Sequence, residues 1–421
     1  MSFGNLSIID PLCRALAKEG YIAPTPIQTL AIPPLLKGKD LMGIAQTGTG
    51  KTAAFVLPIL QKITEQRRTS APGVPRALVI APTRELAAQI DESFATYGQF
   101  LRFRHTAIFG GVRQGPQVKM LSRGVDVLVA TPGRLLDLMN QGYVKLMGVE
   151  FFVLDEIDRM LDMGFIKDMR RIVAALPQKH QSLFFSATVT RETGEFAEKL
   201  LTDPVHIEAA PQASTLDCIK QHVFFVDQDK KQMLLQKLIR DEDMLRVLIF
   251  SRTKRRADEV AQKLRKSGIN ADSIHGNKSQ NQRTKAMHDF KSGRLRVLVA
   301  TDIAARGIDV DDISHVINYD LPNEPECYVH RIGRTGRAGA EGKAYSFCAA
   351  DERNLLRRIE KLTSRRAVVM DHQYHSEKAK MATGAAAEPA KSHRPRHTAR
   401  SFRQDSSRQS VPRKPHPRKQ R

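Results

Sequence analysis

The chain has 421 residues, of which 41% are hydrophobic, so it is long enough for two domains that each bury a core. Its formal net charge of +22 makes a nucleic acid the leading partner, with an anionic membrane surface or an acidic protein as alternatives. The sequence lacks an apolar run of the ~18 residues that a membrane helix needs, a signal-peptide pattern, and cysteine spacing that suits disulfides or zinc. We therefore expect a cytoplasmic protein with no membrane partner.

The first motif along the chain is a strand, a Gly-rich loop and a helix, LMGIAQTGTGKTAAFVLPIL, at residues 41–60. Gly48 and Gly50 let backbone N–H groups approach phosphates. Lys51 can reach the β- and γ-phosphates, and the Thr52 hydroxyl can ligate Mg²⁺ at the start of the helix. The pattern predicts a site for the phosphates of a nucleotide and for Mg²⁺, and the family resemblance described below implies that the nucleotide is ATP.

Short apolar runs alternate with amphipathic stretches over most of the chain, which is typical of buried parallel strands joined by helices. In the first half the runs are 77–82, 125–132, 151–156 and 182–188. In the second half they are 246–251, 296–302, 315–320 and 344–349. The pentapeptide VLVAT occurs in both halves, which suggests two related open α/β sheets.

The boundaries follow from these runs. We expect a first domain at 1–205, a linker at 206–218, a second domain at 219–366 and a disordered basic tail at 367–421. Residues 391–421 hold eleven Lys and Arg against the single acid Asp405. Such a segment cannot bury enough apolar surface to fold alone, so it either adds affinity for a nucleic acid or acts as a solubility tail.

A pair of acids follows the apolar run FFVL at residues 151–154. Functional groups of open α/β sheets gather at the carboxyl ends of strands, where this run places Asp155 and Glu156. Asp155 would hold Mg²⁺ and Glu156 would orient the attacking water. The alternative, a cluster at a helix N-terminus, is less favoured because the phosphate loop lies on the same chain. Ile157, the next residue, is expected to point into the core.

Ten motifs stand in the order found in one family: GYIAPTPIQ (20–28), AQTGTGKT (45–52), APTRELA (81–87), GG (110–111), TPGRL (131–135), DEID (155–158), SAT (186–188), VLIFSRT (247–253), ATDIAARGID (300–309) and HRIGRTGR (330–337). From about residue 3 to residue 363 the chain resembles a DEAD-box RNA helicase of superfamily 2, most closely the bacterial RhlE-type branch. The resemblance implies two tandem RecA-like domains. Ile157 departs from the alanine of the family motif.

The resemblance also implies roles for individual residues. The catalytic residues would be Lys51, Asp155, Glu156 and the arginine fingers Arg334 and Arg337. The nucleotide would contact Tyr21, Gln28, Thr47, Gly48, Thr49, Gly50, Lys51, Thr52, Gly307, Asp309, Arg334 and Arg337. RNA would contact Pro82, Thr83, Arg84, Gly110, Gly111, Thr131 and Arg134 in the first domain, and Arg252 and Thr301 in the second. Asp158, Ser186, Thr188 and His330 would couple the two sites, and Thr52 and Asp155 would hold the metal.

The leading interpretation is an ATP-dependent RNA helicase that unwinds short duplexes or remodels RNA–protein complexes. The alternative is an ATP-gated RNA clamp or assembly scaffold with little unwinding, and a DNA helicase is a third reading. RNA would be held largely through its backbone, without sequence preference. Proteins of ribosome assembly or RNA decay are the partners that the resemblance suggests.

Overall fold

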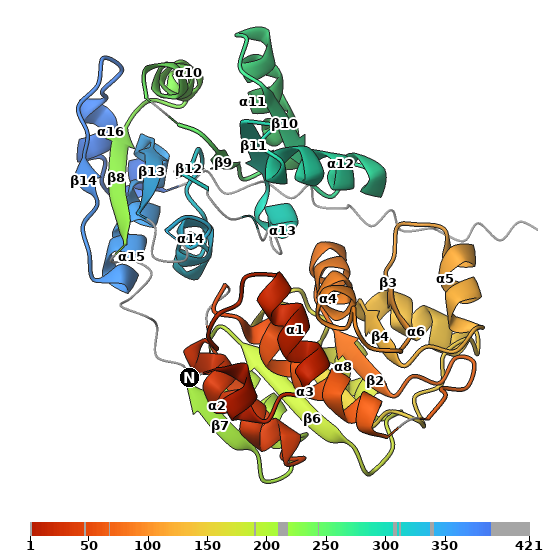
Figure 1. Ribbon diagram of the computed structural model, residues 1–421. Helices are drawn as coiled ribbons and strands as arrows, with labels where there is room; N and C mark the ends of the chain where they lie inside the picture. The colour runs from red at the N-terminus through yellow and green to blue at the C-terminus, as the bar shows by residue number, and fades with distance from the viewer. Residues whose placement is uncertain are drawn as a thin grey trace, which may run out of the picture. The chain divides into compact units, whose positions relative to one another are not determined.

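The computed structural model describes residues 2–45, 48–66, 68–188, 191–208, 218–242, 244–305, 310, 313–336 and 341–388. Within these residues the chain forms two seven-stranded sheets, and every pairing of strands is parallel (Figure 1). This confirms the expected pair of open α/β sheets. We call residues 2–208 domain 1 and residues 218–388 domain 2.

The sheet of domain 1 has the strand order β3-β4-β2-β5-β6-β1-β7. Its strands are β1 (Leu41–Ile44), β2 (Ala77–Ile80), β3 (His105–Ile108), β4 (Val127–Ala130), β5 (Phe151–Asp155), β6 (Gln181–Ser186) and β7 (Val205–Glu208). Alternate strand residues enter different apolar clusters: Ala77 and Val79 belong to one, and Leu78 and Ile80 to the other. The sheet is therefore buried on both faces, as the continuous apolar runs predict.

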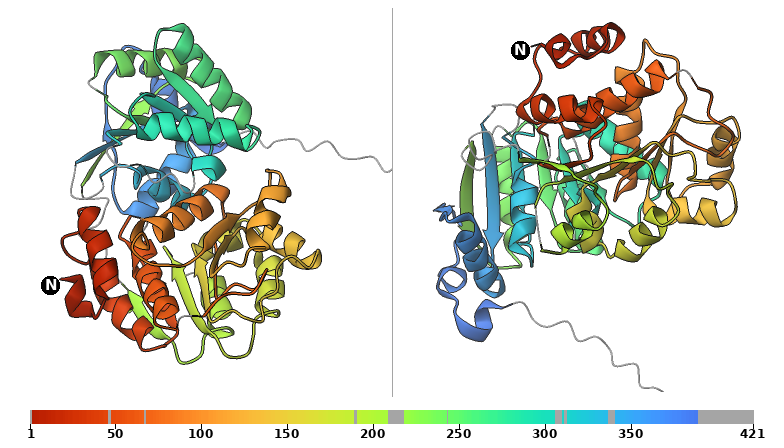
Figure 2. Two further views of the ribbon diagram at one scale, coloured as in Figure 1. Left: turned by 45° about the vertical axis from the view of Figure 1, so that its right-hand side comes forward. Right: turned by 90° about the horizontal axis from the view of Figure 1, so that it is seen from below.

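Helices cover both faces of this sheet (Figure 2). The first cluster includes residues of α1 (Asp10–Lys18), α2 (Pro26–Leu36), α3 (Lys51–Glu65) and α4 (Arg84–Tyr97), together with the short 3₁₀ helix Phe3–Leu6. The second includes residues of α5 (Gln114–Leu121), α6 (Pro132–Asn140), α7 (Ile157–Asp162), α8 (Ile166–Val173) and α9 (Arg191–Glu198).

Domain 2 repeats this plan with the strand order β10-β11-β9-β12-β13-β8-β14. Its strands are β8 (Ile219–Phe225), β9 (Val247–Phe250), β10 (Ala271–Ile274), β11 (Val297–Ala300), β12 (His315–Asn318), β13 (Gly342–Cys348) and β14 (Val368–Val369). The two VLVAT segments contribute β4 and β11, which occupy the same place in the two sheets. The repeated pentapeptide thus marks equivalent strands of two similar domains.

The helices of domain 2 also divide between two apolar clusters. One contains residues of α10 (Lys231–Asp241) and α11 (Lys254–Lys266). The other contains residues of α12 (Gln280–Lys291), α13 (Asp302–Ala305), α14 (Pro325–Ile332), α15 (Arg353–Thr363) and α16 (Glu377–Met381). Two 3₁₀ helices, Ala350–Glu352 and Gly384–Ala387, complete the domain.

The expected linker and tail boundaries are both wrong in part. Strand β7 continues domain 1 to Glu208, because its backbone pairs with β1 along the whole strand. Residues 209–217 of the expected linker lie outside the described residues. Beyond residue 366 the chain does not become a disordered tail at once, because β14 pairs with β8 and the Met370 N–H donates to Val223 O at 2.9 Å.

The rest of this segment is also held by domain 2. The Ser376 hydroxyl donates to Asp227 at 2.8 Å and accepts from the Ala379 N–H at the start of α16. Eleven of the 22 residues at 367–388 are hydrophobic, and the edge of β8 pairs with part of their backbone, which the sequence alone does not reveal. The rest of the expected tail, 389–421, lies outside the described residues.

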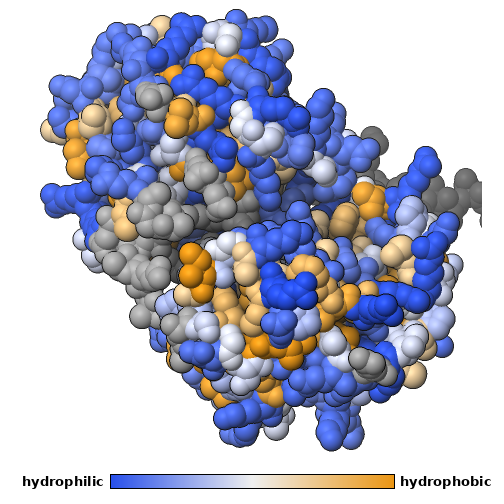
Figure 3. Space-filling view, in the orientation of Figure 1, coloured by the Kyte–Doolittle hydropathy of each residue, from blue (hydrophilic) through white to orange (hydrophobic). Residues whose placement is uncertain are grey.

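The surface agrees with the high charge of the sequence. The face seen in Figure 3 is mostly hydrophilic, with apolar residues scattered over it. Of the helices that the structure describes, none has the length and apolar character to cross a membrane.

Candidate active site and nucleic-acid face

The topology of domain 1 divides the carboxyl edge of its sheet into two parts. Strands β3, β4 and β2 are neighbours, and they lead into the GG, TPGRL and PTR segments expected to bind RNA. Strands β5, β6 and β1 are neighbours, and they lead into the DEID, SAT and phosphate-loop segments. The expected RNA and ATP residues therefore lie on adjoining stretches of one edge, although along the chain the RNA segments stand between the phosphate loop and the acidic motif.

The phosphate loop has the backbone that its glycines predict. Gly48 and Gly50 have φ angles of 84° and 94°, in the left-handed region where glycine is favoured. A Cβ atom at Gly50 would also lie 2.4 Å from the Gln28 side chain. Lys51 opens α3 with its side chain buried, and its Nζ donates to Ala45 O at 2.7 Å. Thr47 lies outside the described residues.

Two expected adenine contacts lie beside this loop. The Gln28 amide accepts from the Thr25 N–H at 2.9 Å and donates to Gly50 O at 3.1 Å, so it joins helix α2 to the phosphate loop. The Tyr21 ring is 40% exposed, and its hydroxyl lies 3.2 Å from that of Tyr97. Tyr21 thus offers a partly open ring face, while Gln28 is buried and engaged within the protein.

Asp155 ends β5 as a buried carboxylate. Among the described residues, no group donates a hydrogen bond to its Oδ1 atom. Burial raises the pKa of Asp155 to about 7, against the opposing effect of Lys51. An unsatisfied buried oxygen costs free energy unless a ligand completes it. The Thr52 hydroxyl, at the second residue of α3, is a second oxygen donor, and such hard oxygen ligands fit Mg²⁺ with water completing its shell.

Glu156 is held in an unusual conformation next to Asp155. Its φ of 57° is in the left-handed region, which is strained for a residue with a side chain. The Arg159 guanidinium donates to the Glu156 carboxylate, and both side chains are buried. Strain of this kind concentrates at functional sites, where the surrounding structure holds it in place.

Asp158 connects the acidic motif to the loop after β6. Its Oδ2 atom accepts from both the backbone N–H and the hydroxyl of Thr188, at 3.0 and 3.1 Å. Of the two coupling residues Ser186 and Thr188, Asp158 bonds to Thr188, whereas the Ser186 hydroxyl donates to Thr188 O at 2.7 Å. Ile157 is fully buried in the second apolar cluster of domain 1, as expected.

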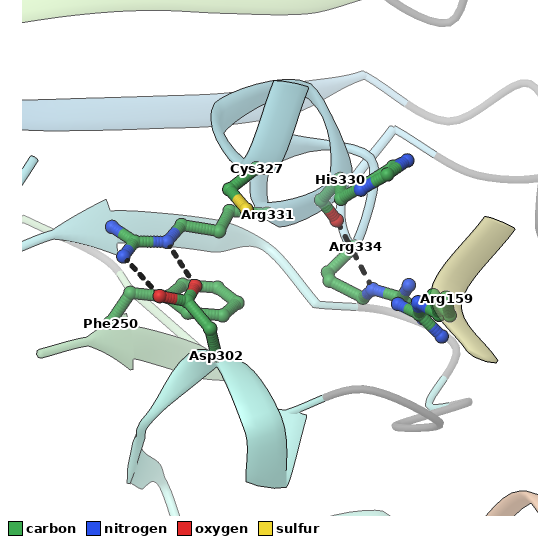
Figure 4. A pocket seen from close by; sticks show the side chains of 7 residues that line it. All are labelled: Arg159, Phe250, Asp302, Cys327, His330, Arg331 and Arg334. Atoms are coloured by element: carbon green, nitrogen blue, oxygen red, sulfur yellow. Dashed lines mark hydrogen bonds and ion pairs between the residues drawn. The ribbon is translucent and has the colours of Figure 1, made fainter. Parts of the chain in front are cut away.

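Domain 2 contributes a group of basic residues around α14 (Figure 4). Arg331 pairs with both carboxylate oxygens of Asp302, at 2.6 and 2.8 Å, and is built into the domain. Arg334 is buried, and its Nε donates to His330 O at 3.3 Å. Burial, with Arg159 nearby, lowers the pKa of His330 to about 4, so the ring is neutral at physiological pH.

Arg159 of domain 1 lines the same small pocket as His330, Arg331 and Arg334 (Figure 4). The expected finger Arg334 thus lies near the residue that holds Glu156. Three other expected nucleotide contacts, Gly307, Asp309 and Arg337, lie outside the described residues.

The expected RNA contacts of domain 1 come together around one glycine turn. The Arg84 guanidinium lies so close to Gly111 that a Cβ atom there would overlap it. Arg134 donates to Gln117 Oε1 at 3.0 Å and to Val112 O at 3.2 Å, which fixes the chain after the turn. Gly110 precedes Gly111 and is partly exposed.

The other three residues are placed by helix starts. Thr83 caps α4 by accepting from the Leu86 N–H at 3.3 Å. Pro82 precedes it, and Thr131 precedes α6. Backbone positions at helix N-termini are suited to phosphate groups.

In domain 2 the expected RNA residue Arg252 is bound to an acid that the motifs do not include. Its Nη2 atom lies 2.9 Å from Glu352 Oε1 and donates to Leu321 O at 3.2 Å. Glu352 is also 2.6 Å from Lys231 Nζ, and both of these side chains are fully buried. Thr301, the other expected contact, is buried after β11.

Sequence reasoning did not identify the residues of α12 that contact Glu85 in the APTRELA segment. Arg283 and Gln280 at the start of α12 contact Glu85, at 2.8 and 3.2 Å. Burial, and next Arg283 and Arg134, lower the pKa of Arg84. The spacing Gln280-x-x-Arg283 at a helix start was a signal for a shared face, as was Glu156-x-x-Arg159. Glu352 and Lys231 had no local signal.

Two family profiles match this chain. One, described as DEAD/DEAH box helicase, covers residues 25–196, and the other, described as helicase conserved C-terminal domain, covers residues 229–339. DEAD-box ATP-dependent RNA helicase CshA of Bacillus subtilis is 42% identical over 366 residues, which span 87% of this chain and 73% of that protein. The chain belongs to the DEAD-box family. The CshA protein of Bacillus licheniformis is 43% identical, over 87% of this chain and 74% of its own length.

Solved DEAD-box structures have the same architecture. Dbp5 of S. cerevisiae, bound to RNA and ADP BeF3, has a TM-score of 0.78 and 32% identity, over 88% of this chain and 95% of that one. A DEAD-box protein of Methanococcus jannaschii has a TM-score of 0.51 and 38% identity, over 88% and 99% of the two chains. This DEAD-box protein is an ATP-dependent RNA helicase with two RecA-like domains, and thus an ATP-hydrolysing enzyme.

Proposed function

We propose that ATP is hydrolysed at the β5, β6 and β1 part of the domain 1 edge, in response to RNA bound at the β3, β4 and β2 part. The observation that carries this proposal is Asp155, whose buried Oδ1 lacks a hydrogen-bond partner among the described residues. It ends β5, which β6 separates from β1, the strand that leads into the phosphate loop and Lys51. With a metal-bound nucleotide in place, the metal ion would lie against the Asp155 carboxylate and the phosphates would lie against the Lys51 ammonium group.

In this proposal each side chain has one task. Lys51 binds the β- and γ-phosphates, and Thr52 and Asp155 hold Mg²⁺, which when bound would neutralise charge on the phosphates. Glu156 orients the attacking water. Arg334 and Arg337 stabilise the charge of the transition state. Thr47, Gly48, Thr49 and Gly50 cradle phosphates, Tyr21 and Gln28 bind adenine, and Gly307 and Asp309 contact the phosphates and ribose.

The coupling between the sites rests on the hydrogen bonds of Asp158. Because Asp158 holds Thr188, a change around the acidic motif is transmitted to the loop after β6. Because His330 belongs to domain 2, it would couple the position of that domain to the acidic motif. RNA-stimulated hydrolysis would then drive local unwinding of short duplexes, with the backbone held by Pro82, Thr83, Arg84, Gly110, Gly111, Thr131, Arg134, Arg252 and Thr301.

The test is strand separation of a short RNA duplex with a single-stranded tail, with and without ATP. We expect ATP-dependent separation and an ATPase that RNA stimulates more than DNA of the same sequence. RNA retention with ATP but no separation would instead support the clamp or scaffold, and equal stimulation by DNA would contradict the preference for RNA.

We also propose that residues 389–421 add electrostatic affinity for RNA. They contain all eleven Lys and Arg of the 391–421 segment. If about five cations neutralise phosphates, the slope of log affinity against log salt becomes steeper by roughly 3.5. A chain that ends at Glu388 keeps the folded segment of domain 2 and is the right truncation. Equal affinities and parallel salt lines for the two chains would leave the tail without this role.

Three finer assignments are inferences from the sequence. We infer a place in the RhlE-type branch and work in the cytoplasm with ribosome-assembly or RNA-decay proteins. Complementation of bacterial strains that lack an RhlE-type or a CshA-type helicase would separate the branches. Affinity purification of the Glu156→Gln variant with ATP would identify the RNA and its associated proteins.

A further inference from the structure

A hollow of about 430 Å³ lies at the amino ends of the strands in domain 1, on the opposite edge from the motifs. Its walls are three connections: the segment after α3, the segment before β3 and the turn before β4. The residues that line it are Arg68, Thr69, Ser70, Arg102, Phe103, Arg104, Gly124 and Asp126. None of them belongs to a motif that the function has used.

The hollow is a built feature and not a loose surface. The Asp126 carboxylate accepts from the Ser70 hydroxyl at 2.6 Å and from the Arg104 N–H at 2.8 Å, so it joins all three connections. Gly124 has a φ of 75°, and a Cβ atom there would lie 2.3 Å from Ser70 O. The backbone that forms the hollow is therefore specified by particular residues.

Its charge is strongly positive and mostly uncompensated. The side chains of Arg68, Arg102, Arg104 and Arg123 are exposed around it. Within the part of the chain that the structure describes, no carboxylate pairs with Arg102, Arg104 or Arg123; the Arg104 guanidinium donates to Arg123 O. Of the acids nearby, Asp126 lines the hollow, but it is buried and its two oxygens accept from the Ser70 hydroxyl and the Arg104 N–H.

The other acid, Glu150, is already neutralised. It is shared between the buried Arg76 and Arg68, at 2.9 Å from each. Guanidinium groups without acid partners attract anions, and their fork of N–H donors matches phosphate geometry. Phe103 also lines the hollow, where its ring stacks on His105 with ring centroids 5.3 Å apart and packs against the first apolar cluster of domain 1.

The hollow is joined to the RNA face by a single strand. Strand β3 is the edge strand of the sheet, with Arg102–Arg104 before its first residue and Gly110–Gly111 shortly after its last. Four residues of strand span about 13 Å. A strand of RNA that leaves the glycine turn along this edge therefore reaches the arginines after a short distance.

We propose that the Arg102–Arg104 hollow is an auxiliary phosphodiester site that holds RNA beyond the stretch bound by the motifs. This rests on the proposed RNA path past Gly110 and Gly111. The site is sequence-independent, because its cations contact phosphates, and it acts only on an RNA long enough to span both places. An acidic protein segment would offer carboxylates instead, but it would give no dependence on RNA length.

The experiment measures affinity for oligouridines of about six and about thirty nucleotides as a function of salt. The Arg102→Ala/Arg104→Ala variant should bind the long RNA on the order of tenfold more weakly at about 0.1 M salt, with a salt slope shallower by roughly 1.4. Its affinity for the short RNA should equal that of the parent. Arg102→Lys/Arg104→Lys should recover most of the salt slope, because it keeps the charge.

Arg170→Ala/Arg171→Ala is the matched control, since it removes two exposed arginines of α8 in the same domain. It should bind both RNAs as the parent does. Equal long-RNA affinity for parent and Arg102→Ala/Arg104→Ala would overturn the proposal, as would equal losses in the control or on the short RNA. If the parent fails to bind the short RNA, the motif face itself is wrong, which is a separate failure.

Discussion

The two domains share one strand order, but the lysine at the equivalent position has an ion-pair partner in only one of them. Lys51 begins α3 after β1, and Lys231 begins α10 after β8, the strand in the same place of the second sheet. Among the described residues, no carboxylate lies within ion-pairing distance of Lys51, whose Nζ is satisfied by Ala45 O. Lys231 is 2.6 Å from Glu352 and 3.7 Å from Asp320.

The acids opposite these lysines differ in the same sense. Asp155 ends β5 and Asp320 follows β12, the equivalent strand. Burial raises the pKa of Asp155 to about 7. Burial also acts on Asp320, but Lys231 and the Arg252 N–H outweigh it and lower its pKa. Among the described residues, Lys51 and Asp155 of domain 1 have no ion-pair partner, whereas in domain 2 Lys231 pairs with Asp320 and Glu352. We infer that the nucleotide binds beside Lys51, because among the described residues domain 1 leaves this lysine and acid without an ion-pair partner and domain 2 does not.

The largest expected effect concerns Arg334 of domain 2. Arg334→Ala should lower RNA-stimulated ATP turnover by about 10³–10⁵-fold, because a finger stabilises charge that develops only in the transition state. The measurement is steady-state ATPase at saturating RNA. Arg358→Ala, an exposed change on α15, is the control and should be near parental. A loss below about tenfold would remove Arg334 from the catalytic set.

Glu156→Gln should lower turnover by about 10²–10⁴-fold and leave ATP binding intact, since the amide keeps the shape but cannot orient or deprotonate water. Nucleotide binding and single-turnover hydrolysis separate the two effects. Glu192→Gln, at an exposed position of α9, should change neither. Near-parental turnover of Glu156→Gln would place the base elsewhere.

Substitutions of the two lysines should have contrasting effects, one on ATP binding and the other on stability. Lys51→Ala should abolish ATP binding with little change in stability, because its counter-charge is supplied by the ligand. Lys231→Met should leave two buried carboxylates with less compensation and cost about 3–5 kcal/mol of unfolding free energy. Denaturant unfolding and nucleotide binding of both variants are the measurements. The comparison between the domains would be broken if Lys231→Met proved as stable as the parent.

Substitutions of Ile157 test whether this departure from the family motif affects core packing alone or also ATP turnover. It is fully buried, so Ile157→Ala should cost about 2–4 kcal/mol and Ile157→Val about 1 kcal/mol, with ATP turnover within a few-fold of the parent. Urea unfolding and ATPase assays measure the two quantities. If turnover fell as far as in Glu156→Gln, the isoleucine would belong to the chemistry.

The smallest effect is a pH dependence expected in domain 2. Burial, with Lys343 nearby, lowers the pKa of His315 to about 4. Its neutral ring therefore favours folding above its ordinary pKa, and this contribution is lost as pH falls from about 6.5 towards 4. The loss near pH 5 should be on the order of 1–2 kcal/mol and should flatten in His315→Gln. His206→Gln, an exposed change in domain 1, should leave the pH profile of unfolding unaltered.

Much of the candidate site was predictable because its signals are local. Gly48, Gly50 and Lys51 lie within one loop, and the apolar run before Asp155 is continuous. Period and turn chemistry act over a few residues, so they are visible in the chain itself. The repeated VLVAT likewise anticipated two equivalent strands.

The contacts that the sequence did not reveal join residues far apart in the chain. Glu352 and Lys231 are separated by 121 positions, and Gln280 meets Glu85 across 195. Residues 367–388 look like the start of a tail because they follow the last stretch that resembles the family, but the open edge of β8 pairs with them. Backbone pairing at a sheet edge depends on which strand is left unpaired, and only the assembled sheet decides that.

By itself, the sequence determined the family, the nucleotide and RNA motifs and the two-sheet plan, because each is written in short runs of residues. Only the tertiary structure decided which charges remain available. Lys51 and Lys231 are both lysines at the start of a helix, and no local pattern says that the second is neutralised. The difference comes from Glu352 and Asp320, which folding brings within 2.6 and 3.7 Å of Lys231. Electrostatic pairing depends on distance in space and burial, which the order of residues alone does not specify.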